Sequence, residues 1–267
     1  MTATSPDTDT NGRSLGSRGP SVWASRLALF LIVVASWEAL STWIVDPFWI
    51  GRPSDIVERI YILIHTGDVF LHASNTVTHA LAGLLLSLVV GIPIGIVFAS
   101  NRFISETIEP YFLGLYSLPR IALAPLFILW FGIGELSKIM MSFSMVVFIV
   151  ILNTYEGLRN TDPELVDMMR AMRASRWAIL RKVRLPSIVS WIFAAVRVGI
   201  GLGLVGAVVG ELLGANKGLG WYIEYSAARL DVTGVFAALA VLMVIGMSLN
   251  EFVKFIEVRL WRSRISD

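Results

Sequence analysis

The chain has 267 residues, of which 55% are hydrophobic and 16% charged, and its formal net charge is only +2. Soluble domains carry about 25% charged residues, so this composition and its long apolar runs indicate a polytopic membrane protein. The lack of cysteine excludes a disulfide framework, a thiolate metal site and a cysteine nucleophile, and the small net charge gives no reason to expect nucleic acid as a partner.

The first segment of the chain is polar. Residues 1–24 are rich in Ser, Thr, Gly and Asp and have no apolar periodicity, so we expect a disordered tail. The apolar run that follows is too long for a signal peptide and lacks a small-residue cleavage site. We therefore interpret it as a membrane anchor.

A membrane-spanning helix needs about 20 apolar residues, and six segments of the chain reach this length. They are residues 25–45, 77–100, 108–131, 136–155, 187–213 and 232–256. The third contains Pro119 and Pro125, so we expect it to be broken or kinked. Between the first two, an amphipathic run from Ile56 to Ile64 predicts a short helix on the membrane interface. Residues 261–267 would form a second tail.

Lys and Arg are unevenly divided between the two sides of these spans. With the N-terminus in the cytoplasm, the N-terminal part through Arg26, the loops 101–107 and 156–186, and the C-terminal end from Lys254 carry fifteen of them, and the outer loops carry five. Cytoplasmic segments are enriched in Lys and Arg. The sequence therefore predicts an all-α, polytopic membrane protein with six transmembrane helices and both termini cytoplasmic.

The long cytoplasmic loop, residues 156–186, contains the basic sequence DMMRAMRASRWAILRKVRLP. Asp162-Pro163-Glu164 supplies an N-cap, a proline at the first helical position and an early acid, which predicts a short helix to about Met172. A second short helix should start at Ser175, and Pro186 should end the loop. Such a loop is often only a topology signal, but two short helices with apolar and basic faces suit docking into another protein's groove.

The spacing in this loop resembles a motif of bacterial ABC importer permeases. That motif reads E-A-A, three residues, G, nine residues, I-x-L-P. Here Asp167-Met168-Met169 stands for E-A-A, Arg173 for G, Val183 for I, and Leu185-Pro186 for L-P.

The resemblance extends over roughly residues 25–260. Residues 116–138, YSLPRIALAPLFILWFGIGELSK, are very similar to permeases of the nitrate, sulfonate, taurine and bicarbonate branch. Residues 91–95 and the stretch from Gly210-Glu211 to Gly218-Leu219-Gly220 also match that branch. The resemblance implies the type I fold of the methionine-importer kind and a multi-pass location in the bacterial cytoplasmic membrane.

It also implies a transport subunit that is not itself an enzyme. The sequence has no GxxxxGK[ST] pattern, so no cofactor is expected on this chain, and ATP and Mg²⁺ are expected on a separate ATPase. The implied partners are a second copy of the chain, two ATPase subunits, an extracytoplasmic solute-binding protein and the lipid bilayer. The implied ATPase-coupling residues are Asp162, Glu164, Asp167, Arg170, Arg173, Ser175, Arg176, Trp177, Leu185 and Pro186.

Arg173 departs from this motif. A glycine would permit a left-handed turn between the two short helices, whereas an arginine there costs about 1 kcal/mol or more if φ is positive. Two alternatives remain: the turn is built differently, or Arg173 makes a charge contact with the ATPase.

Charged residues inside the spans are candidates for function, because a charge in the bilayer is costly without a partner or water. Arg120, with Ser117 and Pro119 beside it, is expected to line the translocation path; the alternative is a structural ion pair with Glu38. Glu211 is expected either to line the outer mouth of this path or to sit at the membrane interface. We expect Arg197 to be structural.

Small residues recur on the fifth span at Gly199, Gly203, Gly206 and Gly210. They allow close helix approach, which suits packing within the chain or, alternatively, a dimer contact around a central pore. We therefore expect a homodimer.

Other classes of function fit less well. The histidines His65, His72 and His79 are seven residues apart, which is about 10.5 Å per step on a helix and too far for shared metal ligation, so no metal site is predicted. An intramembrane hydrolase would need a GxSG-like turn and an in-span histidine, and a scaffold would need no coupling loop. The resemblance favours a small organic or inorganic anion as solute, such as sulfonate, taurine, nitrate, bicarbonate or an aromatic carboxylate; the alternative is a vitamin or vitamin precursor.

Overall fold

The computed structural model describes residues 20–265, and these residues are almost entirely helical. The helices are α1 (Pro20–Trp43), α2 (Pro47–Ile50), α3 (Pro53–Thr66), α4 (Asp68–Ser100), α5 (Arg102–Tyr116), the 3₁₀ turn η1 (Arg120–Leu123), α6 (Ala124–Phe131), α7 (Glu135–Arg159), α8 (Pro163–Ala171), α9 (Arg176–Ile179), the π turn η2 (Leu180–Arg184), α10 (Leu185–Ser187), α11 (Val189–Gly214), α12 (Leu219–Ala228) and α13 (Val232–Ile265).

Within this described part, five helices are long and apolar enough to cross a membrane: α1, α4, α7, α11 and α13. A sixth span is present if α5 and the η1–α6 run count as one, and these two pieces are bent by 78°. The six predicted spans and the predicted break in the third are therefore found, and the break falls at Pro119, which precedes η1.

The chain divides into two compact units after Ser54. In the first, Asp46 caps α2 by accepting a hydrogen bond from the Phe48 amide at 2.9 Å. Glu38 of α1 accepts hydrogen bonds from the amide and the hydroxyl of Ser54, at 3.0 and 2.8 Å. The carboxylate inside the first span is thus satisfied within its own unit.

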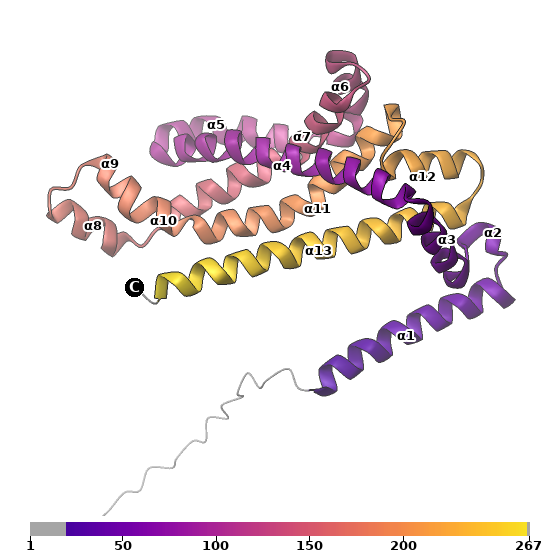
Figure 1. Ribbon diagram of the computed structural model, residues 1–267. Coiled ribbons are helices and arrows are strands. Elements are labelled where there is room, and N and C mark those ends of the chain that lie inside the picture. Colours follow the sequence, from indigo (N-terminus) through magenta and orange to yellow (C-terminus); the bar gives the residue numbers. More distant parts are fainter. Residues whose placement is uncertain (1–19, 266–267) are drawn as a thin grey trace, which may run out of the picture. The chain divides into compact units, whose positions relative to one another are not determined.

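Helix α7 is the centre of the second unit, where it runs beside α4 and α11 (Figure 1). Met141, Val146 and Val150 on this helix are completely buried. Glycines on both neighbours make this packing close: a Cβ at Gly206 of α11 would lie 2.6 Å from Ser142 Cα, and one at Gly95 of α4 would lie 2.8 Å from the Ile151 oxygen. Because small residues let helices approach, these glycines set the spacing of the three-helix core.

The glycines that were candidates for a dimer contact all belong to this core. Gly199 faces Leu84 and Val146, and Gly203, Gly206 and Gly210 face α7 at Ser142 and Lys138. The alternative of packing within the chain is therefore the one that the structure shows. These four positions are buried within the subunit.

The sharp corner between α4 and α5 differs from the predicted 101–107 loop. Asn101 alone separates the two helices, and its side chain accepts a hydrogen bond from the Phe103 amide at 2.9 Å. Arg102 and Glu106 pair at 2.6 Å one turn apart, so the charges that suggested a loop lie on the first turn of a helix, where such pairs are favourable.

Several ends also differ from prediction. The first helix begins at Pro20, so residues 20–24 are helical, and α4 begins nine residues before the predicted span, at Asp68. Helix α13 continues to Ile265, through most of the predicted tail at 261–267. Polar and charged residues extend these helices beyond their apolar stretches, which hydropathy alone does not register. The predicted tail positions 1–19 and 266–267 lie outside the described residues. The amphipathic run 56–64 lies inside the helix α3, as expected, and its location on the membrane interface stays a prediction.

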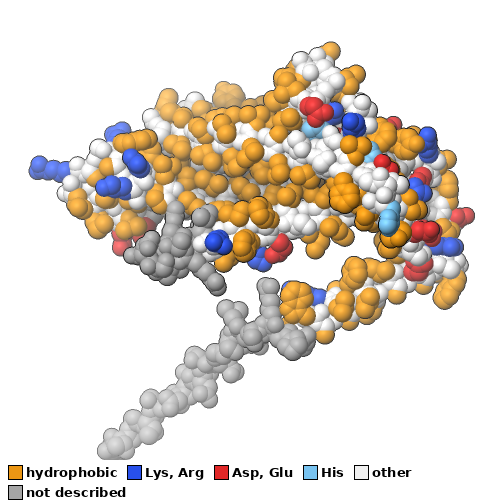
Figure 2. All heavy atoms as spheres, viewed as in Figure 1, with side chains coloured by type: hydrophobic (Ala, Val, Ile, Leu, Met, Phe, Trp, Pro, Cys, Tyr) orange, Lys and Arg blue, Asp and Glu red, His pale blue; other side chains and the backbone are white. Residues whose placement is uncertain are grey.

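The surface of the second unit reflects its environment. Figure 2 shows hydrophobic side chains over the middle of this unit and a group of Lys and Arg side chains at the end that holds α8 and α9. Leu85, Val89 and Tyr111, among many large apolar residues, are more than 60% exposed. Such an apolar belt is expected of a surface that lies against lipid.

Candidate functional site

The basic segment, residues 162–186, forms two short helices at one end of α7 and α11 (Figure 1). Asp162 caps α8 by accepting from the Glu164 amide at 2.9 Å, and Ser175 caps α9 by accepting from the Ala178 amide at 3.2 Å. The N-cap at Asp162 and the start of the second helix at Ser175 were predicted, and both side chains satisfy a free amide of a first helical turn. On α8, Arg170 pairs with Asp167 at 3.0 Å.

A left-handed turn joins the two short helices. Arg173 has φ +55°, its amide donates to the Arg170 oxygen at 2.9 Å, and the Ala174 amide donates to the Met169 oxygen at 3.0 Å. These two bonds form a Schellman motif, whose left-handed position is usually glycine. Of the two alternatives for Arg173, a differently built turn is therefore excluded, and an arginine occupies the strained position.

The second short helix continues into the fifth span. After α9, the π turn η2 leads through α10 and Ile188 into α11, and the Ile188 and Ile192 amides continue the ladder by donating to the Arg184 and Ile188 oxygens. The prediction that Pro186 ends the loop is wrong. Pro186 is the second residue of α10, and the wider π turn before it accommodates a residue without an amide hydrogen.

Apolar side chains cover the outward face of the basic segment. Leu165, Met168, Met172 and Trp177 are 46 to 71% exposed. Val166 and Ile179, on the same two helices, are buried. The segment is thus attached by one face and presents a second apolar face that nothing in the described chain covers.

Arg120 lies at the break in the third span. Its guanidinium donates to the Tyr116 oxygen at 2.9 Å and to the Met145 oxygen at 3.4 Å, and it lies 4.7 to 4.9 Å from the centroids of the Phe148 and Tyr116 rings. Glu38, the alternative partner, belongs to the other unit, where its carboxylate accepts hydrogen bonds from Ser54. Carbonyl oxygens and ring faces hold the cation instead, and its Nε is buried without a partner.

The four residues predicted for the translocation path separate into two places. Ser117 and Pro119 lie beside Arg120 at the break, where the Ser117 hydroxyl donates to the Leu113 oxygen. Glu211 lies elsewhere. Its neighbour Gly210 packs on Lys138 of α7, whereas Arg120 donates to the Met145 oxygen of the same helix. Lys138 and Met145 are two helical turns apart, which is about 10 Å along the axis of α7.

Glu211 is the acceptor at the centre of a buried polar network. Its carboxylate is 1% exposed and accepts hydrogen bonds from the Thr76 hydroxyl at 2.8 Å and the Gly220 amide at 2.9 Å. His79 lies 2.8 Å from it through Nδ1 and reaches the Glu135 carboxylate through Nε2 at 2.5 Å. Glu211 of α11 is thus buried in this chain, where it contacts α4 and α12 directly and reaches Glu135 of α7 through His79; its place on the translocation path stays a prediction.

The same network caps the N-terminus of α12 with groups from other helices. The amides of Gly218, Leu219 and Gly220 donate to His72 Nδ1, the Thr76 hydroxyl and Glu211, at 3.2, 2.8 and 2.9 Å. Gly218 has φ +114°, and a Cβ on it would collide with the Glu211 carboxylate. Buried helix ends need such partners, so Glu211 and the glycines behind it form one structural unit.

Sequence reasoning missed the histidines of this network. His72 and His79 are buried at 7% and 1% exposure, at positions that hydropathy places before or at the start of a span. Their spacing of seven residues places them on one face of α4. This spacing could have indicated a shared polar environment, but it was related only to metal binding. In the described part of the chain no group of three His, Cys, Asp or Glu residues could hold a metal ion.

Arg197 is structural, as predicted. It pairs with Glu257 at 2.5 Å and so joins α11 to α13. Both groups retain some exposure, which moderates the energy of such a pair.

The described chain thus has a polytopic helical fold with a broken span and a capped basic segment that leads into a span, as is expected of a membrane transport subunit. Residues 91–262 match the family described as binding-protein-dependent transport system inner membrane component. The chain belongs to this family and is an ABC transporter permease of the type I importer kind.

Known relatives and structures agree with this family. The chain is 31% identical to the formylaminopyrimidine transport permease protein ThiX of Halalkalibacterium halodurans over 82% of this chain and 87% of the relative. It is 30% identical to the putative aliphatic sulfonates transport permease protein SsuC of Bacillus subtilis, over 90% and 88% of the two chains. The fold matches a chain of the MetNI methionine ABC transporter in an inward facing conformation, with a TM-score of 0.61, 20% identity and coverage of 77% of this chain and 97% of that one.

Proposed function

We propose that this permease forms, with a second copy of itself, the pore of an ATP-driven importer that moves a small solute into the cytoplasm by alternating access. Two ATPase subunits would bind ATP and Mg²⁺ on the cytoplasmic side, where both termini would lie, and an extracytoplasmic binding protein would deliver the solute. The bacterial cytoplasmic membrane is the proposed location. The bias of Lys and Arg supports the orientation.

The observation that carries this proposal is the basic segment. Its two capped helices expose an apolar face formed by Leu165, Met168, Met172 and Trp177, and basic side chains flank this face. An exposed apolar helix face with a charged rim suits insertion into a groove of another protein. We therefore assign the ATPase contact to this segment, with the turn at Arg173 at its tip.

Two classes of solute are supported. The relative named for aliphatic sulfonates and the in-span cation Arg120 favour a small organic or inorganic anion, which Arg120 would attract at the break of the third span. The relative named for formylaminopyrimidine favours a vitamin precursor. We propose the anion, because a partly buried guanidinium whose Nε has no partner is the kind of group that an anion satisfies.

Isolation of the tagged chain from native membranes in mild detergent tests the assembly. Mass spectrometry and a particle mass should give two copies of this chain and two ATPase chains. A chain that is isolated alone under several gentle conditions would contradict the proposal.

Uptake into proteoliposomes that contain the whole importer and its binding protein tests the solute. We expect ATP-dependent uptake of a radiolabelled alkanesulfonate, reduced at least tenfold by Arg120→Gln, with Arg197→Gln as the matched control. Uptake of a formylaminopyrimidine and of no anion would instead select the second class.

A further inference from the structure

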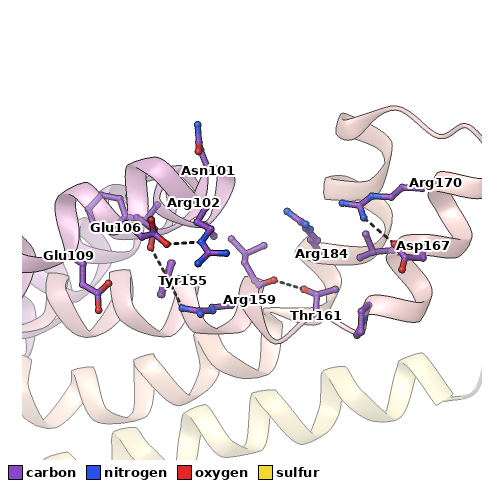
Figure 3. Close-up of a pocket in the computed structure, with 16 residues that line it drawn as sticks. Asn101, Arg102, Glu106, Glu109, Tyr155, Arg159, Thr161, Asp167, Arg170 and Arg184 are labelled. Carbon is purple, nitrogen blue, oxygen red and sulfur yellow. Dashed lines mark hydrogen bonds and ion pairs between the residues drawn. The ribbon is translucent and has the colours of Figure 1, made fainter.

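A hollow lies between the basic segment and the corner formed by α4 and α5 (Figure 3). It consists of two adjoining cavities of about 610 and 750 Å³. Asn101, Leu158, Arg170 and Arg184 line both cavities. The hollow is therefore enclosed by the ends of two spans on one side and by the short helices on the other.

Cations predominate in the lining of this hollow. Five arginines contribute to it, against three carboxylates. The arginines are Arg102, Arg159, Arg170, Arg176 and Arg184, and the carboxylates are Glu106, Glu109 and Asp167. Two of the arginines are neutralised by neighbours, Arg102 by Glu106 and Arg170 by Asp167. A net positive charge remains in a concave space.

Arg184 is a lining cation whose side chain is partly buried. Its Nε is buried and has no hydrogen-bond partner among the described residues. Figure 3 shows its side chain between the corner helices and α8, with no interaction drawn to it. A buried donor without an acceptor is costly, so the site is incomplete without an anion.

We propose that this hollow binds a phosphate-bearing anion, with Arg184 as the central ligand and Arg159 as a second one. A planar guanidinium matches phosphate oxygens in geometry and charge. The hollow lies beside the ends of α4 and α7. On the proposed function these ends lie at the membrane surface, which would put the hollow at the level of lipid headgroups, where basic pockets between spans bind acidic headgroups. The phosphate could come from an acidic phospholipid or from the free ion, and the test below separates these sources.

An acidic side chain of the ATPase is the competing occupant. The exposed apolar residues of the basic segment, such as Met172 and Trp177, are not part of the lining. The apolar face suited to a protein partner is thus separate from the hollow, although three residues implied in ATPase coupling, Asp167, Arg170 and Arg176, line the hollow. The separation of the apolar face from the hollow favours a small anion there.

Native mass spectrometry of the detergent-purified full chain tests the proposal, with added dioleoylphosphatidylglycerol or dioleoylphosphatidylcholine. The wild-type chain should retain the anionic lipid over the zwitterionic one. Arg184→Gln should weaken this retention about tenfold, the usual effect of losing a hydrogen bond to a charged group, and Arg159→Gln should also weaken it. Arg181→Gln is the matched control, because Arg181 lies on the same π turn and lines neither cavity.

A competition arm identifies the source of the phosphate. Millimolar inorganic phosphate is added to the lipid-bound wild-type chain and to the Arg181→Gln control. If phosphate displaces the lipid from both, the free ion is the ligand. If phosphate displaces the lipid from neither, the lipid headgroup is the ligand. Arg159→Gln carries the test if Arg184→Gln does not fold.

Three results would overturn the proposal. These are equal retention of the two lipids, retention by both the Arg184 and the Arg159 variants that equals wild type, and loss of the anionic lipid when the ATPase subunit is added. The last would assign the hollow to the ATPase.

Discussion

Replacing Arg173 with glycine should stabilise the turn of the basic segment. A residue with a Cβ in the left-handed region costs about 1–2 kcal/mol, and Arg173 has φ +55°. Glycine also has more conformational freedom than arginine when the turn is open. This entropy favours the open turn by about 0.4–1 kcal/mol and so offsets part of the strain energy that glycine removes. The net gain of roughly 0.5–1 kcal/mol lowers the open fraction of the turn about two- to fivefold.

Hydrogen exchange measures this change directly. The amide of Ala174 donates to the Met169 oxygen at 3.0 Å only while the turn is closed, so its exchange in Arg173→Gly should slow about two- to fivefold if exchange follows local opening. The matched control is Arg173→Ala, which keeps the Cβ and lacks the guanidinium, and which should exchange as the wild type does. Unchanged or faster exchange in Arg173→Gly would refute the reasoning from backbone strain.

The same two variants separate the turn from a charge contact. If both variants lose the ATPase subunit during purification, the Arg173 guanidinium contacts that subunit. If only the glycine variant changes, the backbone of the turn is what matters.

Three further predictions concern the core of the second unit, each measured by thermal unfolding in detergent. Gly206→Ala should destabilise by about 1–3 kcal/mol, because it overpacks the contact with α7, whereas Gly201→Ala, which meets open space, should have little effect; equal effects would contradict this packing. Glu211→Gln should lower the free energy of unfolding by about 3–5 kcal/mol, because it leaves the buried network incomplete. Glu135→Gln should lower it by less than half as much, because the Glu135 side chain is 68% exposed. A larger loss in Glu135→Gln would exclude Glu211 as the centre of the network. In a double-mutant cycle, the pair of Arg197 with its carboxylate partner on α13 should couple by about 0.2–1 kcal/mol, and a coupling above 2 kcal/mol would show that the pair is effectively desolvated.

Local features of the sequence predicted much of this fold. Apolar length located the spans and the prolines located the break. Asp162 was recognised as an N-cap, and the second short helix was expected to start at Ser175, because helix starts depend on residues only two or three positions apart. The α4–α5 corner was missed for the opposite reason: Arg102 and Glu106 interrupt the apolar pattern, and their stabilising pairing is visible only once the helix exists.

The polar network shows where sequence reasoning fails. Glu211 and His79 are 132 residues apart, and their contact depends on how α4, α7 and α11 pack. Hydropathy assigns Glu211 a position near a span end but cannot show which side of the helix is covered. The close approach of α12 could be suspected from Gly218 and Gly220, yet only the packed structure shows that their missing side chains make room for the Glu211 carboxylate and the backbone of α11.

The unbroken path from α9 into α11 limits how the subunit moves. Helix α11 has 26 residues, a length of roughly 39 Å, and ends in the Glu211 cluster. Only short helical turns separate the N-terminus of α11 from Trp177 on α9. A displacement of the short helices would therefore be passed directly to α11. The π turn η2 is the segment of this helical path expected to deform most easily, because a π turn interrupts regular α-helical hydrogen bonding. A displacement of α9 that the π turn did not absorb would reach the far end of α11, where Glu211 accepts a hydrogen bond from the Gly220 amide of α12.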